Sequence, residues 1–183
     1  MKYNKTVALK DGRLCVLCSG TAQDGHALLD IFLRTHAQTD FLSSYPDEND
    51  FTVEQEAAFL QRMEDSENEL ELLAEVDGSV VGSAGISALG SKTKTRHRAR
   101  FGISVDEACW RLGIGRALTQ ACIECARAAG YAQLELDVVG DNTAALSLYK
   151  SVGFVEYGRN PRGFRSRQSG WQTLVLMRLE LTE

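Results

Sequence analysis

The stretch that decides the fold reads Trp110-Arg111-Leu112-Gly113-Ile114-Gly115-Arg116. It lies between an apolar strand expected at 99–105 and a helix expected at 113–129, where apolar residues recur every three or four positions. The N–H groups at the start of such a helix lack internal partners, and the helix dipole adds partial positive charge there. The stretch therefore predicts an anion-binding turn, in which glycines let a phosphate approach and Arg116 is a further donor.

The Gly-x-Gly motif alone occurs in several nucleotide-binding folds. A Rossmann fingerprint requires a third glycine where this chain has Leu118, and a P-loop requires Gly-Lys-Ser/Thr. Neither pattern is present. A tight turn that binds no ligand stays open at this point.

Composition limits the class of protein. The chain has 183 residues, 44% of them hydrophobic, and we expect a single domain over residues 1–183. Its net charge of −5 predicts no general affinity for nucleic acid or anionic membranes, so neither is expected as a partner. Residues 1–10 lack the apolar core of a signal peptide, and no stretch reaches the roughly 20 apolar residues of a membrane span. We therefore expect a cytoplasmic protein.

The five cysteines are odd in number and scattered, which favours reduced thiols over a disulfide framework. Cys15 and Cys18, like Cys122 and Cys125, form a Cys-x-x-Cys pair, but the pairs lie about a hundred residues apart, too far for a zinc ribbon. The three histidines lack acidic partners at ligand spacing. We expect no metal site, and we interpret the cysteines as small buried hydrophobic residues.

The period of the hydrophobic pattern changes along the rest of the chain. Strands are expected at 14–18, at 70–76 and 80–89 around an Asp-Gly turn, at 134–138, at 154–157 and at 171–181. Further helices are expected after Gly25, after Thr52, which can form a capping box with Gln55, and after Asp141 or Asn142. This order suits one central mixed sheet covered by helices, an α/β layer architecture.

A second motif follows one strand after the turn, and it reads Asn142-Thr143-Ala144-Ala145-Leu146-Ser147-Leu148-Tyr149-Lys150-Ser151-Val152-Gly153-Phe154. With the strand and the turn before it, this Asn-x-x-Ala-x-x-x-Tyr-x-x-x-Gly-Phe block resembles the GNAT superfamily of acetyl-CoA-dependent N-acetyltransferases over residues 99–157. The hairpin at 75–82 and the last strand also resemble that family. The resemblance implies an α/β (α+β) fold with a central mixed, mostly antiparallel sheet of six to seven strands and about four flanking helices.

The resemblance also implies a site for acetyl-CoA as cosubstrate. The backbone of Ile103 and Val105 would pair with the pantetheine arm, and Asn142 would hydrogen-bond it. The pyrophosphate would be held by the turn, through Leu112, Gly113, Ile114, Gly115, Arg116 and Ala117.

Direct attack of an amine on a thioester needs a deprotonated nucleophile, a donor to the oxyanion and a proton for the leaving thiolate. We assign Tyr149 as the general acid, because its ordinary pKa of about 10 keeps its proton in place at neutral pH. A backbone N–H near Val105 is the oxyanion donor. Tyr149 also shares an apolar helical face with Leu148 and Val152, so a packing role alone is the alternative.

The sequence does not identify the general base. Relatives often carry an acidic residue on the strand before the turn, where this chain has Arg100. The nearest carboxylates by strand position are Glu75, Asp106, Glu135 and Asp137. Each is explained equally well as a solvated strand-end residue. The missing acid keeps a second function open, a non-catalytic CoA-binding or regulatory module.

The acceptor is expected to be a small-molecule or peptide amine of unknown identity, and a homodimer stays open. The loop 39–50, with Phe41 and Tyr45, lies where the family usually forms one wall of the acceptor site. Two basic stretches are candidates for contact with an acidic acceptor: the alternating run at 92–100, if it extends a strand, and the loop expected at 159–167. A solvated hairpin tip is the favoured interpretation of the first stretch, and loop solvation explains the second equally well.

Overall fold

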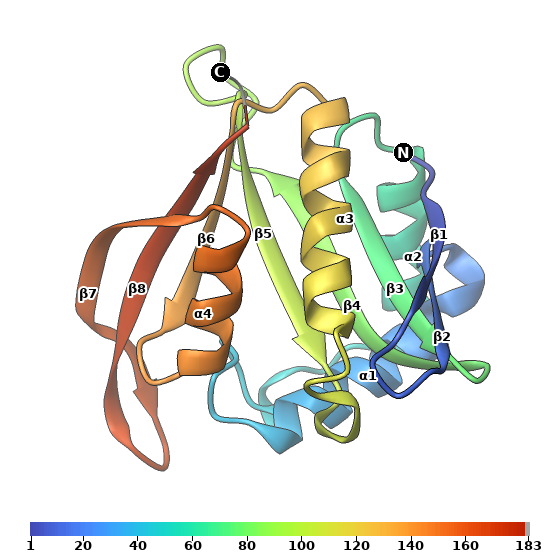
Figure 1. Cartoon of the computed structure of the whole chain (residues 1–183), viewed down its shortest axis with the longest axis horizontal. Coiled ribbons are helices and arrows are strands. Elements are labelled where there is room, and N and C mark those ends of the chain that lie inside the picture. Colours follow the sequence, from blue (N-terminus) through green and yellow to red (C-terminus); the bar gives the residue numbers. More distant parts are fainter. Residues whose placement is uncertain (182–183) are drawn as a thin grey trace.

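The computed structural model describes residues 1–181 and contains a mixed sheet of eight strands in the order β1-β2-β3-β4-β5-β6-β8-β7 (Figure 1). All neighbouring strands are antiparallel except β5 and β6. The strands are β1 Asn4–Ala8, β2 Leu14–Ser19, β3 Leu70–Val76, β4 Ser79–Ala88, β5 Arg98–Val105, β6 Gln133–Val139, β7 Val155–Ser166 and β8 Gly170–Glu180.

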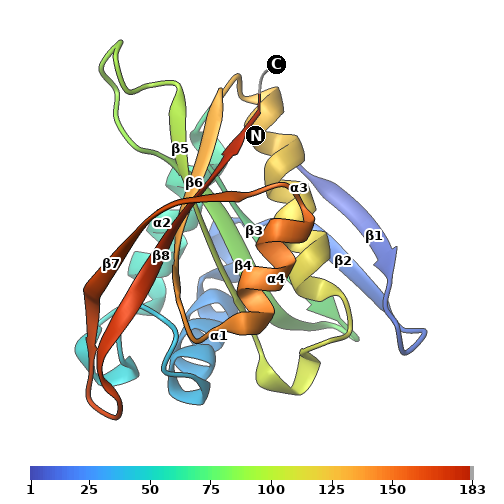
Figure 2. The same ribbon diagram turned by 60° about the vertical axis from the view of Figure 1, so that its left-hand side comes forward.

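Four α-helices cover the two faces of this sheet. They are α1 Gly25–Gln38, α2 Val53–Asp65, α3 Ile114–Ala128 and α4 Thr143–Ser151. Helices α3 and α4 lie on one face and α1 and α2 on the other (Figures 1 and 2). Within residues 1–181, no helix has the length and apolar character needed to cross a membrane.

Each face of the sheet has its own buried cluster. The larger cluster includes Leu118 of α3 and Leu72 of β3, and the smaller one joins Leu28, Leu60 and Leu73 under α1 and α2. Leu72 and Leu73 belong to different clusters because successive side chains of a strand point to opposite faces. All five cysteines are free, and four of them are buried, as expected for small hydrophobic residues.

The predicted fold class is confirmed, with one more strand than the upper expectation. Strand β1 was not predicted, because its sequence is polar and most of it is exposed at the sheet edge. An edge strand needs only one hydrogen-bonded neighbour and buries no apolar face, so it leaves no alternating pattern in the sequence.

The basic loop expected at 159–167 is wrong for most of its length. Strand β7 continues through it to Ser166 and pairs with β8, with register shifts at Glu156/Gly158 and Asn160/Phe164. Exposed polar residues there carry no signal that separates a strand from a loop. The basic run at 92–97 forms turns and β5 begins only at Arg98, which agrees with the favoured interpretation as a hairpin tip.

Local capping signals were predicted correctly. Thr52 caps α2 and forms the capping box with Gln55. Asp77 and Gly78 both have positive φ, at 52° and 77°, as the tight turn between β3 and β4 requires. Gly130 ends α3 with φ of 80°.

Strands β5 and β6 separate soon after they meet. They pair in parallel only at Arg98–Gln133, Ala99–Leu134 and Arg100–Glu135. Beyond these pairs the rest of β5 runs away from β6 (Figure 1). The end of β5 therefore has a sheet neighbour on the β4 side alone.

Candidate functional site

The separated edge of β5 presents backbone groups that no neighbouring strand uses. Val81 O accepts the N–H of Asp106 at 2.9 Å, and Gly82 lies opposite Val105. This pattern makes Gly82 and Val105 a non-hydrogen-bonded pair, so the N–H and C=O of Val105 point away from β4. The same alternation turns the backbone of Ile103 toward the gap. The structure thus supports the expected exposure of both backbones, while their ligand stays a prediction.

Trp110 occupies one of these exposed backbone groups. Its indole Nε1 donates a hydrogen bond of 2.7 Å to the carbonyl of Val105. The carbonyl of Val105 is therefore occupied, and its N–H is the group left for a ligand.

The turn before α3 has the backbone shape of an anion site. Gly113 precedes the helix with φ of 105°, and Arg111 also has positive φ, 64°. Within the described residues, the N–H groups at positions 112–116 have no backbone acceptor outside the helix, whereas the N–H of Ala117 donates to Gly113 O at 3.0 Å. Ala117 was expected among the phosphate-binding amides, and this bond removes it from the unpaired donors.

Side chains around the turn are already engaged. The guanidinium of Arg116 donates to the Ser151 hydroxyl of α4 at 2.7 Å, and the side chain of Ile114 is buried in the core. The carbonyl of Leu112 accepts the N–H of Lys10 at 3.1 Å, which fixes the turn to the β1–β2 hairpin. Anion binding at this turn therefore depends first on backbone N–H groups.

Asn142 and Tyr149 lie at the two ends of α4. The Oδ1 atom of Asn142 accepts the N–H of Ala145 at 3.1 Å as the helix cap, which leaves the side-chain NH2 for another partner. Tyr149 is 7% exposed, and its ring meets Phe101 of β5 edge-on at 6.1 Å between centroids. Burial raises the pKa of the Tyr149 hydroxyl above its ordinary value, so the group holds its proton at neutral pH.

Three of the four expected base candidates are paired with cations. Glu135 binds Arg98 through two hydrogen bonds, and Asp137 lies 3.7 Å from Arg100. Asp106 accepts hydrogen bonds from Arg34 at 2.7 Å and from Gln38 at 3.0 Å. Although burial opposes ionisation, these bonds and the N–H of Ala108 hold the pKa of Asp106 below its usual value. Glu75, the fourth, lies outside the cavity described next.

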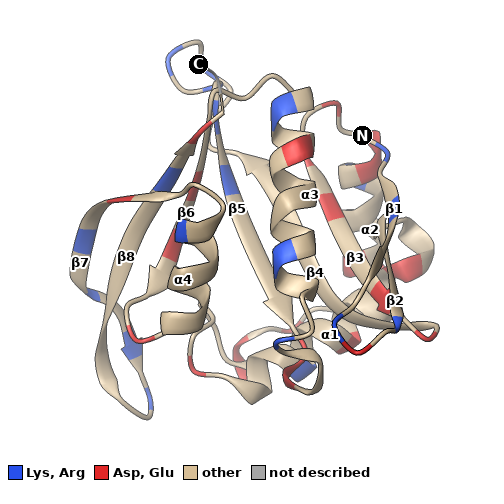
Figure 3. Ribbon diagram, viewed as in Figure 1, with Lys and Arg blue, Asp and Glu red and all other residues tan. Residues whose placement is uncertain are grey.

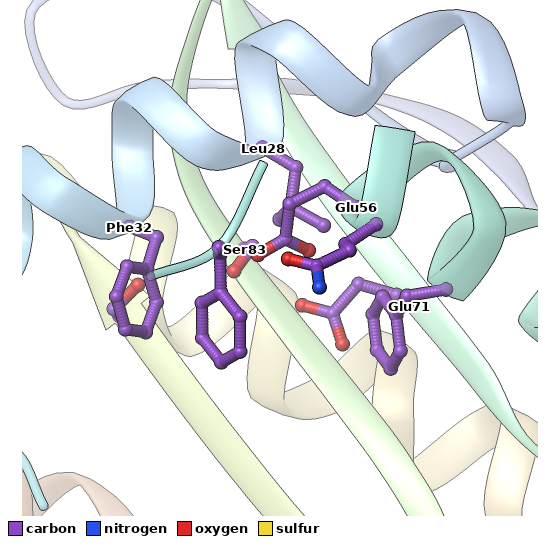
Figure 4. A pocket seen from close by; sticks show the side chains of 9 residues that line it. Leu28, Phe32, Glu56, Glu71 and Ser83 are labelled. Carbon is purple, nitrogen blue, oxygen red and sulfur yellow. The ribbon is translucent and has the colours of Figure 1, made fainter. Parts of the chain in front are cut away.

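Two other carboxylates line a cavity of about 450 Å³ between helices α1 and α2 and the sheet (Figure 4). Glu56 comes from α2 and Glu71 from β3, and in Figure 4 both side chains point into the same space. The cavity is lined by Leu28, Phe32, Phe51, Gln55, Glu56, Phe59, Glu71, Ser83 and Ser104. Sequence reasoning missed this site, because its residues come from five separate segments.

The position of the Glu71 carboxylate depends on a glycine in the neighbouring strand. It lies opposite Gly85, where a Cβ atom would come within 2.1 Å of Glu71 Oε2. Burial raises the pKa of Glu71 to about 7, nearby Glu56 adds to the shift, and Ser83 opposes it. A single glutamate inside the apolar run 70–76 was the one sequence signal for this residue.

The loop 39–50 is fastened to the β7–β8 hairpin. Asp40 accepts hydrogen bonds from Ser166 at 2.6 Å and from Tyr45 at 2.9 Å. Arg167 lies over the Tyr45 ring at 4.3 Å and donates to Asp47 at 2.7 Å. Figure 3 shows basic residues along this hairpin and acidic residues on β3 and β6. In the described part of the chain, no group of three His, Cys, Asp or Glu residues is arranged to hold a metal ion.

Comparisons with known proteins agree with this architecture. An N-alpha-acetyltransferase RimI from Mycobacterium tuberculosis is 41% identical over 88 residues, which are 48% of this chain and 53% of that protein. The chain spans about half the length of the curated relatives it matches.

Two solved structures share the fold. The acetyltransferase of GNAT family from Streptococcus pneumoniae has a TM-score of 0.86 and 29% identity, covering 91% of this chain and 99% of that one. A GNAT superfamily phosphinothricin acetyltransferase from Sinorhizobium meliloti, in complex with AcCoA, has a TM-score of 0.79 and 20% identity, covering 92% and 89%. The acetyltransferase (GNAT) family pattern matches residues 31–154. This chain belongs to the GNAT family of acetyltransferases.

Proposed function

We propose that this chain transfers an acetyl group from acetyl-CoA to a primary amine by direct attack. One observation carries the proposal: the unpaired edge of β5 ends beside a turn with free N–H groups, and Tyr149 packs against the same strand. Family membership supports the activity.

The separated strands suit the pantetheine arm of acetyl-CoA. An extended amide chain can pair with β5 through the backbone of Ile103 and the N–H of Val105, in the way an added strand would. The side-chain NH2 of Asn142 is a further donor. At the other end, the N–H groups of residues 112–116 and the dipole of α3 favour the pyrophosphate.

The groups on β5 and α4 suit the chemical step. The N–H of Val105 can donate to the oxyanion that forms when the amine attacks the thioester carbonyl. When the C–S bond breaks, the Tyr149 hydroxyl can give its proton to the departing thiolate, and Tyr149 regains a proton from the new ammonium through water. The raised pKa of Tyr149 keeps this proton in place until the thiolate appears.

The alternative is a non-catalytic CoA-binding module, which the presence of Arg100 in place of an acid favours. Two measurements separate the two functions: calorimetric titration with CoA, and thiol release from acetyl-CoA in the presence of a panel of primary amines. We expect CoA binding and amine-dependent thiol release. Binding without release for any amine would support the module, and absence of CoA binding would reject both.

A further inference from the structure

The cavity under α1 and α2 holds two acids without a basic partner. In residues 1–181, neither Glu56 nor Glu71 takes part in an ion pair, and no Lys, Arg or His lines the cavity. Glu56 is 8% exposed, its carboxylate accepts no hydrogen bond from the residues that the structure describes, and its side chain points into the cavity (Figure 4). Partial burial of a carboxylate costs free energy, and a bound cation would offset that cost.

Four of the remaining lining residues are apolar or aromatic. Phe32 and Phe51 meet edge-on at 5.4 Å, and Phe59 and Leu28 also line the cavity. The other lining residues are uncharged and polar: Gln55, Ser83 and Ser104. Aromatic faces attract cations and also pack against an apolar stem. A volume of about 450 Å³ suits a small organic ligand.

The basic residues near the cavity do not neutralise its two glutamates. Arg62 lies over the Phe59 ring at 5.3 Å and forms no ion pair with either glutamate. His36 stacks on Phe32 at 3.8 Å, and burial lowers its pKa, so it is mostly neutral at pH 7. The uncompensated charge within the cavity is therefore negative.

The cavity extends to the strand where transfer is proposed to occur. Ser104 of β5 lines it, and the next residue, Val105, turns its N–H toward the β5–β6 gap. Ser83 lies opposite Ser104 in β4, and Glu71 lies in the next strand, β3, opposite Gly85 and two residues from the Ser83 register. The two faces of the proposed centre thus meet at the end of β5.

We propose that this cavity is the acceptor subsite, that it takes a primary ammonium group on an apolar stem, that Glu56 binds the cation, and that Glu71 removes its proton. This inference rests on the proposed acetyl transfer. The Glu71 carboxylate takes one proton from R–NH3⁺, and the freed amine attacks the thioester carbon. The C–N bond forms, the C–S bond breaks, and Glu71 later releases its proton to water.

Two further properties follow from this arrangement. Glu71 must be ionised to act as base, so kcat/KM should rise with pH and level off above about 7. An acceptor with a carboxylate beside its amine would place a third negative charge near Glu56 and Glu71, and it should be a poor substrate.

The experiment uses three probes of similar shape: 2-phenylethylamine, 2-phenylethanol and L-phenylalanine. Binding to the protein saturated with CoA is measured by calorimetry, and transfer is measured by thiol release from acetyl-CoA between pH 5.5 and 9. The variants are Glu56→Gln and Glu71→Gln. Glu54→Gln, an exposed glutamate on the same helix as Glu56, is the matched control. CoA affinity and circular dichroism show that each variant is folded.

We expect 2-phenylethylamine to bind and react, whereas 2-phenylethanol does not bind and L-phenylalanine reacts at least tenfold more slowly. Glu56→Gln should raise KM for the amine at least tenfold. Glu71→Gln should lower kcat about 100-fold at pH 7.5 and remove the acidic limb of the pH profile, while Glu54→Gln changes neither.

Three results would overturn the inference. If neither Glu56→Gln nor Glu71→Gln weakens amine binding, the acidic cavity is excluded as the subsite. Equal binding of 2-phenylethanol and 2-phenylethylamine would exclude it as well. Retention of the acidic limb in Glu71→Gln together with its loss in Asp137→Asn would assign the base to β6. CoA binding and thiol release with other amines, but no binding of 2-phenylethylamine, would reject the acceptor subsite and leave the proposed function standing.

Discussion

The turn before α3 and the cavity under α2 offer ligands two different kinds of surface. At the turn, the donors are backbone N–H groups, and Gly113 provides the left-handed conformation that they need. In the cavity, the charged groups are the side chains of Glu56 and Glu71, and the backbone is already used in the sheet and in α2. A backbone site depends on conformation, so it resists most side-chain changes, whereas the cavity depends on the chemistry of two carboxylates.

Loss of the Tyr149 hydroxyl should slow the transfer step as strongly as loss of the Glu71 carboxylate does. In Tyr149→Phe the thiolate loses its proton donor, so kcat should fall about 100-fold, while the Kd for CoA changes less than twofold. Steady-state thiol release and calorimetry measure the two quantities. Tyr131→Phe is the matched control, because Tyr131 is also buried and its hydroxyl has no hydrogen-bond partner within residues 1–181. An unchanged kcat in Tyr149→Phe would reduce Tyr149 to a packing role.

Neutralising Glu71 should make the protein more stable. The pKa of Glu71 is raised on folding from 4.5 to about 7, so the folded state disfavours its charged form and loses stability as pH rises through this range. Glu71→Gln should therefore raise the free energy of unfolding by about 1–3 kcal/mol at pH 8 and by much less at pH 4.5. Urea titrations at both pH values measure this difference, with Glu54→Gln as control. An equal effect at the two pH values would contradict the raised pKa.

Replacing Gly113 tests whether the turn before α3 binds its ligand through the conformation of its backbone. Gly113→Ala forces a side chain into φ of 105°, which should reduce the free energy of unfolding by roughly 1–2 kcal/mol and weaken CoA binding. Gly102→Ala serves as the stability control, since Gly102 has no positive φ and an added Cβ would contact nothing. Thermal melting and CoA titration give both quantities. Equal losses in the two variants would show that φ is not the cause.

Arg111→Gly should have the smallest effect on the free energy of unfolding. Its φ of 64° is unfavourable for a residue with a side chain, so Arg111→Gly should stabilise the turn by a few tenths of a kcal/mol, after about 0.5–1 kcal/mol of chain entropy is subtracted. Chemical denaturation measures the change. A marked loss of CoA affinity in this variant would instead show that the guanidinium, rather than the backbone, holds the anion.

The sequence determined the features whose signals are local. The Gly-x-Gly turn, the cap of α2 at Thr52, the cap of α4 at Asn142 and the apolar face of α3 each depend on residues within a few positions of one another. Capping, turn geometry and helical periodicity act over such distances, so one chain was enough to predict them. Polar edge strands such as β1 and the C-terminal half of β7 have no alternating apolar pattern, because most of their side chains are exposed. Only the structure shows that they are strands.

Tertiary structure alone decided which polar groups share a site. Glu56, Glu71 and Ser104 belong to three different elements, and the Glu71 carboxylate has room because Gly85 has no side chain. Tertiary structure likewise placed the Trp110 indole on the Val105 carbonyl and paired Glu135 and Asp137 with arginines of β5. These relations depend on strand register and on helix packing across the sheet, which bring together residues that the sequence keeps apart.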